Sequence, residues 1–420
     1  MSEKVEVCDN DQITKFEEPN GEPTCSIVFE NNPKRVYYTG QVASGCVHLA
    51  INERTLVRAI YATIVGRGYC KWIEGSKHTR TYSKEDVYFS RKIYYVGSQN
   101  NPSGCTTVES GDYKYSFDCN IPDECPTSVE ERTGFIRYSV TVVIEEDVDK
   151  KKEFVESFTV LNPLNLNDDE ANSYPQSDEG EFIFTKYCCC LCCWLTEPAK
   201  ISAKVPMKGY APGQAIEITI NVDNKSNHTY DDFKGIIFKK VEFYANDRTW
   251  SSTDKLATFT CEGCKAGEQL SRKLIVTVPP TARTEKSNIC SISYHLTVES
   301  FVGCNDDENL KFEFLLVIGT YPVQNTQTGS MVITEQPNKS ISNNGEHFKA
   351  SASQTIVTSS SKKQNIIDRL VPDYQVGESI RTDKELADSF RPMYPMYINK
   401  QFPLSCTVAV EPGEVKQIVM

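Results

Sequence analysis

Apolar and polar residues alternate along several segments of the chain. In one segment every second residue is apolar: Ile136, Tyr138, Val140, Val142 and Ile144. A period of two residues is typical of a strand that buries one face and exposes the other to water. The pattern therefore predicts antiparallel strands of the kind that build β-sandwiches.

The same alternation recurs elsewhere, in residues 113–117, 216–222 and 274–278. No long stretch of the first 320 residues has the 3.6-residue apolar stripe that an amphipathic helix needs. The 21 tyrosines and 19 phenylalanines also favour strands. We therefore expect the first three-quarters of the chain to be all-β.

An internal repeat divides this all-β part in two. Tyr38-Thr-Gly-Gln41 and Tyr210-Ala-Pro-Gly-Gln214 each open a strand, and Ile121-Pro122 and Val278-Pro279 stand later in each copy. Glycine suits a tight turn, and proline ends a strand because it cannot donate to the ladder. The first copy is longer by about 16 residues, which we place around Ser76–Gly104.

The repeat and the composition predict four regions. They are an N-terminal sandwich over 13–164, a hinge over 165–181, a C-terminal sandwich over 182–322 and a flexible, largely disordered tail over 323–420. The hinge is rich in Asn, Asp, Ser, Glu and Pro. The tail is rich in Ser, Thr, Asn, Gln and Lys and has too little apolar surface to offset the entropy of folding.

Several short motifs together carry a family resemblance. In the first copy they include Phe29-Glu-Asn, Tyr38-Thr-Gly-Gln, Gly66-Arg-Gly, Gly111-Asp-Tyr and Ile136-Arg-Tyr. In the second they include Gly209-Tyr-Ala-Pro-Gly-Gln, Asn224-Lys-Ser, Tyr294-His-Leu and Ile318-Gly-Thr. No single motif is specific, but their order and spacing over residues 15–325 resemble the arrestin domain-containing family, the α-arrestins. The resemblance implies two tandem arrestin-like antiparallel β-sandwich domains.

The resemblance also implies a function. Members commonly act as trafficking adaptors, in which the sandwiches bind membrane-protein cargo and PPxY motifs in the tail recruit HECT-type ubiquitin ligases through WW domains. We therefore expect a cytoplasmic adaptor, recruited to the plasma membrane and endosomes by peripheral association, that promotes ubiquitination, endocytosis or endosomal sorting. One alternative is a structural sorting-coat subunit of the retromer type, which shares the double sandwich but lacks a ligase-recruiting tail. Another is a thiol-based redox regulator that interacts with thioredoxin.

The tail departs from the family pattern, because no P-P-x-Y motif occurs in the sequence. The nearest segments are Val371-Pro372-Asp-Tyr374 and Arg391-Pro392-Met-Tyr394, which keep the second proline and the tyrosine. Prolines preset the extended conformation that WW domains bind, and Val371 can still pack on an aromatic ring. These residues are our candidates for WW-domain binding. An ordinary Pro-x-Tyr turn is the alternative.

The stretch Phe390–Tyr397 is the most apolar part of the tail. It is a candidate docking segment, which folds either on a partner or on a sheet edge of the chain itself.

A cysteine cluster precedes the first strand of the second copy: Cys188, Cys189, Cys190, Cys192 and Cys193. A further C-x-x-C pair is formed by Cys261 and Cys264. The two groups lie far apart in the sequence, which argues against one tetrahedral zinc site. The alternatives are free thiols, reversible palmitoylation of the cluster, and a redox role for Cys261 or Cys264.

Charge and motif content exclude several classes of function. A formal net charge of -12 disfavours a nucleic-acid binder, which needs a basic face. No secretory signal or apolar run of roughly 18–20 residues is present, so we expect reduced thiols in the cytosol. The five histidines show no ligand spacing, and no phosphate loop or hydrolase motif occurs. We therefore expect no catalytic residue, no metal and no cofactor.

Overall fold

The computed structural model describes most of the two predicted sandwiches and four short segments of the tail. These residues are 21–30, 32–98, 104–147, 149–182, 185–187, 193–195, 198–300, 310–323, 372–377, 390–397, 407–409 and 415–417. In this part of the chain, no helix has the length and apolar character of a membrane span.

The first sandwich packs two sheets face to face, and their strands are antiparallel except for the parallel pair β2–β11. One sheet has the order β1 (Thr24–Phe29), β3 (Val42–Ile51) and β8 (Gly111–Asn120). The other has the order β2 (Val36–Tyr38), β11 (Lys150–Leu161), β10 (Gly134–Asp147), β5 (Ala59–Glu74) and β6 (Arg80–Val96), with β9 (Val129–Glu130) beside β10. The short strands β4 (Thr55–Val57) and β7 (Thr106–Val108) pair with each other.

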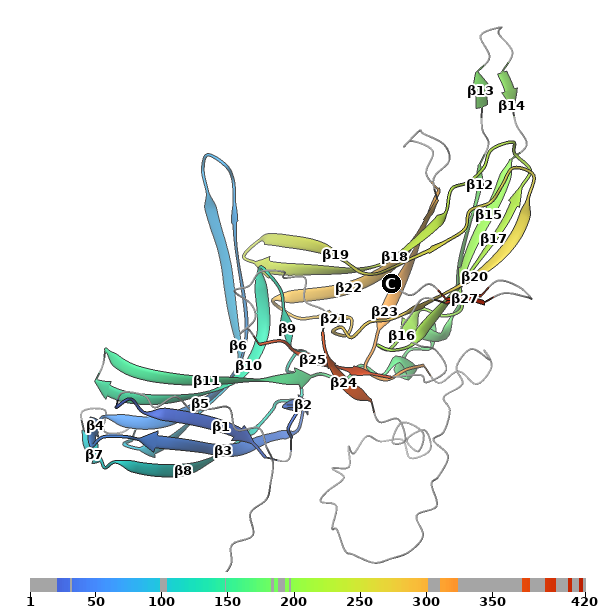
Figure 1. Cartoon of the computed structure of the whole chain (residues 1–420). Helices are drawn as coiled ribbons and strands as arrows, with labels where there is room; N and C mark the ends of the chain where they lie inside the picture. Colours follow the sequence, from blue (N-terminus) through green and yellow to red (C-terminus); the bar gives the residue numbers. More distant parts are fainter. Residues whose placement is uncertain are drawn as a thin grey trace, which may run out of the picture.

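The second sandwich repeats this plan. One sheet has the order β12 (Gln176–Phe182), β15 (Ala199–Val205), β17 (Ala215–Asn224) and β20 (Gln269–Thr277), followed by the tail strands β26 (Thr407–Ala409) and β27 (Val415–Gln417). The other has the order β16 (Gly209–Tyr210), β23 (Leu310–Ile318), β22 (Cys290–Ser300), β18 (Phe233–Ala245) and β19 (Arg248–Cys261), with β21 (Glu285–Lys286) beside β22. A separate hairpin pairs β13 (Thr185–Tyr187) with β14 (Cys193–Leu195) and projects from this sandwich (Figure 1).

The predicted repeat is confirmed by matched turns. Gly40 and Gly213 both have positive φ angles, +79° and +88°, a region that glycine enters without steric cost. The Gln41 side chain accepts a hydrogen bond from the Tyr38 N–H at 2.9 Å, and that of Gln214 accepts one from the Ala211 N–H at 2.6 Å. The same device therefore opens β3 and β17.

A second matched device lies in the two cores. The hydroxyl of Tyr138 donates to the carbonyl of Pro126, and that of Tyr294 donates to the carbonyl of Ala282, both at 2.6 Å. Both tyrosines are fully buried, so each hydroxyl needs such a partner. The alternating residues of 136–144 are buried as predicted, and each contributes roughly 1.5–3 kcal/mol by leaving water.

The extra length of the first copy also lies near the predicted place. The β5–β6 hairpin has strands of 16 and 17 residues, whereas the matching β18 and β19 have 13 and 14. The longer hairpin stands out from the molecule in Figure 1.

The segment predicted as a hinge contains regular structure. It includes two 3₁₀ turns, η1 (Leu166–Asp168) and η2 (Glu170–Ser173), and most of strand β12. The side chains of Asn165 and Asp169 accept hydrogen bonds from backbone N–H groups of these turns. The Asn and Asp content that indicated a linker thus serves to cap turns.

Two tail segments lie between the sandwiches. Strand β24 (Asp373–Val376) pairs antiparallel with β25 (Met393–Met396), and both lie where the two sandwiches meet, beside β2 and β21 (Figure 1). From composition, these residues are predicted to belong to a flexible tail. Their apolar side chains instead pack on the body of the protein, as described below.

Candidate functional site

One edge of the first sandwich is open. Within the described residues, β1 pairs only with β3, and the Lys150–Val155 part of β11 pairs only with β10. The Glu30 N–H donates to the Ser44 carbonyl of β3. Because main-chain direction alternates along a strand, the N–H and C=O groups of Ile27 and Phe29 face away from β3, toward the open side. Such an edge can pair with another extended segment.

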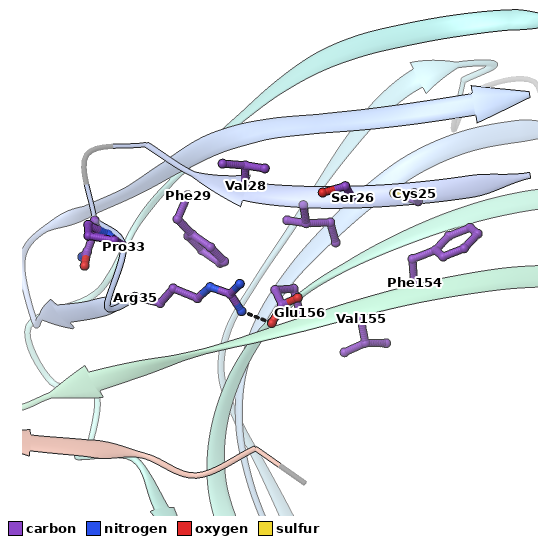
Figure 2. Close-up of a pocket in the computed structure, with 11 residues that line it drawn as sticks. Cys25, Ser26, Val28, Phe29, Pro33, Arg35, Phe154, Val155 and Glu156 are labelled. Carbon is purple, nitrogen blue, oxygen red and sulfur yellow. Dashed lines mark hydrogen bonds and ion pairs between the residues drawn. The ribbon is translucent and has the colours of Figure 1, made fainter. Parts of the chain in front are cut away.

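A groove of about 400 Å³ runs between these two edges. It is lined by Cys25, Ser26, Ile27, Val28, Phe29, Asn32, Pro33, Arg35, Phe154, Val155 and Glu156. Figure 2 shows Phe29 on the side of β1 that faces β11, and an ion pair between Arg35 and Glu156 at one end of the groove. Val28 and Val155 are 48% and 60% exposed, which leaves apolar surface at its rim.

The second sandwich shows what such a gap can hold. Strands β15 and β23 occupy the positions of β1 and β11, and β12 lies between them. β12 pairs antiparallel with β15 along its whole length, and the Gln176 side chain donates to the Leu315 carbonyl of β23 at 2.9 Å. The groove of the first sandwich therefore corresponds to the position that β12 fills in the second sandwich.

A second binding region lies at the junction of the sandwiches. We call it the tail seat and define it by the residues that hold the tail: Lys34, Tyr38, Ser128, Thr159, Pro212, Gly213 and Thr320. The first four belong to the first sandwich and the last three to the second. The tail thus contacts both sandwiches.

Tyr394 is the most deeply placed tail side chain. It is 6% exposed, and its hydroxyl donates to the carbonyl of Ser128 at 2.9 Å. The neighbouring Met393 N–H donates to the Thr159 hydroxyl at 3.1 Å. Burial, with the carboxylates of Glu131 and Glu130 nearby, raises the pKa of Tyr394 well above its usual value. The hydroxyl is therefore held neutral, as a hydrogen-bond donor.

Two further tail tyrosines are held by hydroxyl contacts. The hydroxyls of Tyr374 and Tyr38 lie 3.0 Å apart, and Lys34 pairs with the adjacent Asp373. Tyr397 donates through its hydroxyl to the Thr320 carbonyl and through its N–H to the Pro212 carbonyl, each at 2.9 Å. The seat therefore holds all three tail tyrosines by hydrogen bonds to their hydroxyl groups.

Beneath the tail, buried charges join the two sandwiches. Glu131 of the first forms an ion pair with Lys239 of the second, and both side chains are under 10% exposed. Burial acts to lower the pKa of Lys239, but the Glu131 carboxylate, together with Tyr294 and Cys290, outweighs burial and the pKa is raised. The Glu285 carboxylate accepts from the Thr127 N–H at 3.1 Å, across the same junction, and from Arg283. These bonds fix the arrangement on which the seat depends.

The structure places four of the five WW-domain candidates in this region. Pro372, Tyr374, Pro392 and Tyr394 belong to the docked segments, and Val371 lies outside the described residues. Their binding to a WW domain stays a prediction. Of the two expectations for Phe390–Tyr397, the structure shows docking on the chain itself, at the domain junction and not as an added strand on a sandwich edge.

The cysteine candidates fall into two groups. Cys188, Cys189, Cys190 and Cys192 lie outside the described residues, and Cys193 is in β14 with its side chain not described. Cys261 and Cys264 are 5% and 0% exposed, and burial raises the pKa of each to about 11. A buried, protonated thiol is a poor nucleophile. In the described part of the chain, no three His, Cys, Asp or Glu side chains cluster as metal ligands would.

Sequence reasoning missed the residues that receive the tail and those that line the groove. Ser128 and Thr159 carry no recognisable motif, and Tyr38 was noted only as part of the repeated turn. The exposed Val28 and Val155 lie on β1 and β11. Only the pairing of strands in the folded chain shows that these two strands have unpaired edges among the described residues. Neither site has a signal in the local sequence.

Comparison with known families agrees with this architecture. The family model of the arrestin (or S-antigen) N-terminal domain matches residues 25–167, and that of the arrestin (or S-antigen) C-terminal domain matches residues 196–323. The two matches coincide with the two sandwiches, in the same order.

Individual relatives share limited identity over much of the chain. Arrestin domain-containing protein 4 of Homo sapiens is 23% identical over 307 residues, which cover 70% of this chain and 71% of that protein. Arrestin domain-containing protein 1 of Rattus norvegicus is 24% identical over 268 residues, 63% of this chain and 58% of that protein. Arrestin domain-containing protein 17 of Caenorhabditis elegans is 25% identical over 206 residues, 47% of each chain. With both domain models matched to a double sandwich, the chain belongs to the arrestin domain-containing family of adaptor-type proteins, the α-arrestins.

Proposed function

We propose that the chain is a non-enzymatic trafficking adaptor whose first sandwich binds an extended segment of a membrane-protein cargo along β1. The open groove between β1 and β11 carries this proposal, because the matching gap in the second sandwich holds strand β12. Main-chain pairing supplies affinity in this mode of binding, and pockets for alternate side chains supply selectivity.

The lining of the groove suits such a segment. Phe29 and Phe154 offer apolar surface, whereas Arg35 and Glu156 offer one charge of each sign. A cargo strand with alternating apolar side chains and a charged residue near one end would satisfy both.

An array of cytoplasmic-tail peptides from membrane proteins, probed with the full chain, tests cargo binding. The double variant Val28→Asp with Val155→Asp places charge on the rim of the groove and should lower the affinity for peptides by about tenfold or more. Val87→Asp is the matched control. Val87 is exposed to a similar degree, 58%, but lies on β6, outside the groove. Equal binding by both variants would refute the groove as the cargo site.

The second part of the proposal concerns the ligase. We propose that the Pro-x-Tyr segments around Tyr374 and Tyr394 recruit a WW domain of a HECT-type ubiquitin ligase, and that the chain acts at the plasma membrane and endosomes. A pull-down with WW domains tests recruitment, and a fluorescent fusion tests location. WW binding that survives Tyr374→Ala combined with Tyr394→Ala would remove these motifs from the account.

A further inference from the structure

We propose that the tail seat and a WW domain compete for the same tail side chains, so that the folded chain withholds its Pro-x-Tyr segments until the tail leaves the seat. This inference rests on the ligase recruitment proposed above and adds its regulation. It assigns to the domain junction a binding site for extended segments that carry proline and tyrosine, with the chain's own tail as occupant.

The competition follows from burial of the motif itself. A WW domain binds such a segment by packing its prolines and tyrosine against aromatic rings. In the folded chain Pro392 and Tyr394 are both buried, and the Tyr394 hydroxyl is bonded to Ser128. The side chains cannot occupy the seat and a WW domain at once.

The second motif is held by the same structure. Tyr374 lies opposite Pro395 in the β24–β25 pair, and Gln375 lies opposite Tyr394. Arg391 donates to the Gly377 carbonyl at 2.9 Å, which ties the outer ends of the two strands together. Release of either strand therefore removes support from the other.

Docking also depends on both sandwiches. Met393 is bonded to Thr159 of the first sandwich, and Tyr397 to Pro212 and Thr320 of the second. These contacts exist together only while the sandwiches keep their arrangement. A ligand that changes that arrangement would expose the motifs, so tail release can report such a change to the ligase.

The chain offers a matched pair of glycines for a test. A Cβ at Gly213 would lie 2.3 Å from the backbone oxygen of Tyr397, whereas a Cβ at Gly40 would lie 2.5 Å from the side-chain carboxylate of Asp123. A side chain can rotate away, but the Tyr397 backbone cannot move without losing its bond to Pro212. Gly213→Ala should therefore release the tail. Gly40→Ala carries the same left-handed backbone strain and should not.

The experiment uses a WW domain from a HECT-type ligase as probe. Its affinity is measured for a synthetic peptide of residues 368–400, for the full chain, and for full-length Gly213→Ala and Gly40→Ala. We expect the full chain and Gly40→Ala to bind at least about tenfold more weakly than the peptide, because only the released fraction is competent. Gly213→Ala should approach the peptide. Amide hydrogen exchange at Met393 and Tyr397 is followed in parallel and should be fast only in Gly213→Ala and in the WW complex.

The outcomes separate the two proposals. If the WW domain binds the peptide and the full chain equally, or leaves the Met393 and Tyr397 amides protected, the competition is wrong while recruitment stands. If the WW domain does not bind even the peptide, recruitment is wrong and the competition falls with it. Fast exchange at both amides in the unmodified chain would overturn the seat itself.

Discussion

The two sandwiches share one plan but differ at the edge formed by β1 in the first and by β15 in the second. In the second, β12 lies between β15 and β23. In the first, the space between β1 and β11 is a groove. Because the matched turns and buried tyrosines agree in detail, this difference is not a general divergence of the two copies. It is the basis of our proposal that the first sandwich binds a strand from another molecule, whereas the second fills the matching position with its own β12.

The tail treats the two copies differently as well. At the matched turns, the tail meets the first copy through side chains, with Tyr374 against Tyr38, and the second through backbone, with Tyr397 against Pro212 and Gly213. A substitution in one matched turn should therefore not have the effect of the same substitution in the other.

The largest expected effect comes from removing the buried ion pair that joins the two copies. Lys239→Met breaks an ion pair with Glu131 whose two side chains are both under 10% exposed, which should cost about 3–5 kcal/mol of unfolding free energy. Lys240→Met removes the partially exposed partner of Glu242 and should cost less than about 1 kcal/mol. Denaturant unfolding measures both. Similar small losses in the two variants would contradict the role given to the pair.

The same pair gives a pH dependence with a definite sign. The pKa of Lys239 is raised above its usual 10.5 in the folded chain. The unfolded chain therefore loses this proton first as pH rises, so the stabilisation is complete below about pH 10.5 and declines above it. Lys239→Met should remove this part of the alkaline loss of stability, while other groups still titrate.

Replacing either of the matched core tyrosines by phenylalanine should cause a smaller loss of stability, and the two losses should differ. Tyr138→Phe leaves one buried carbonyl without its donor and should cost about 1–3 kcal/mol. Tyr294→Phe removes the matching bond to Ala282 and also the 3.0 Å contact with the Thr281 hydroxyl. The second contact of the Tyr138 hydroxyl is with the Cys125 thiol, a weaker hydrogen-bonding group, so Tyr294→Phe should cost more. Thermal unfolding of both variants checks the order. A larger loss for Tyr138→Phe would show that the two cores do not use the device alike.

The smallest effect concerns reactivity without loss of stability. Cys105 of the first copy is exposed, whereas Cys261 and Cys264 of the second are buried with pKa values raised to about 11. Iodoacetamide at pH 8 should modify Cys105 before Cys261 and Cys264. Modification of the buried pair should be slower by about a hundredfold and should speed up as pH rises toward 11. Rapid labelling of Cys261 or Cys264 in the folded chain, followed by mass spectrometry, would revive a redox role.

Local sequence was sufficient for much of the fold and little of the site. Alternation at 136–144 and the repeated Tyr38 and Tyr210 turns are short-range signals, and they located the two sandwiches. Strand β12 was missed because its sequence, Gln176–Phe182, is polar and does not alternate, so its conformation comes from pairing with β15. The seat contacts tail residues that are distant in the sequence: Tyr38 and Tyr374, for example, lie 336 positions apart. Such contacts are fixed by tertiary packing, which periodicity does not contain.

The claim that the first sandwich receives a strand along β1 is tested most directly by amide hydrogen exchange of the full chain with a bound cargo peptide. The account predicts new protection at the Ile27 and Phe29 amides of β1 and unchanged exchange along β15, whose edge β12 already covers. Unchanged exchange at Ile27 and Phe29 in a saturated complex would contradict it.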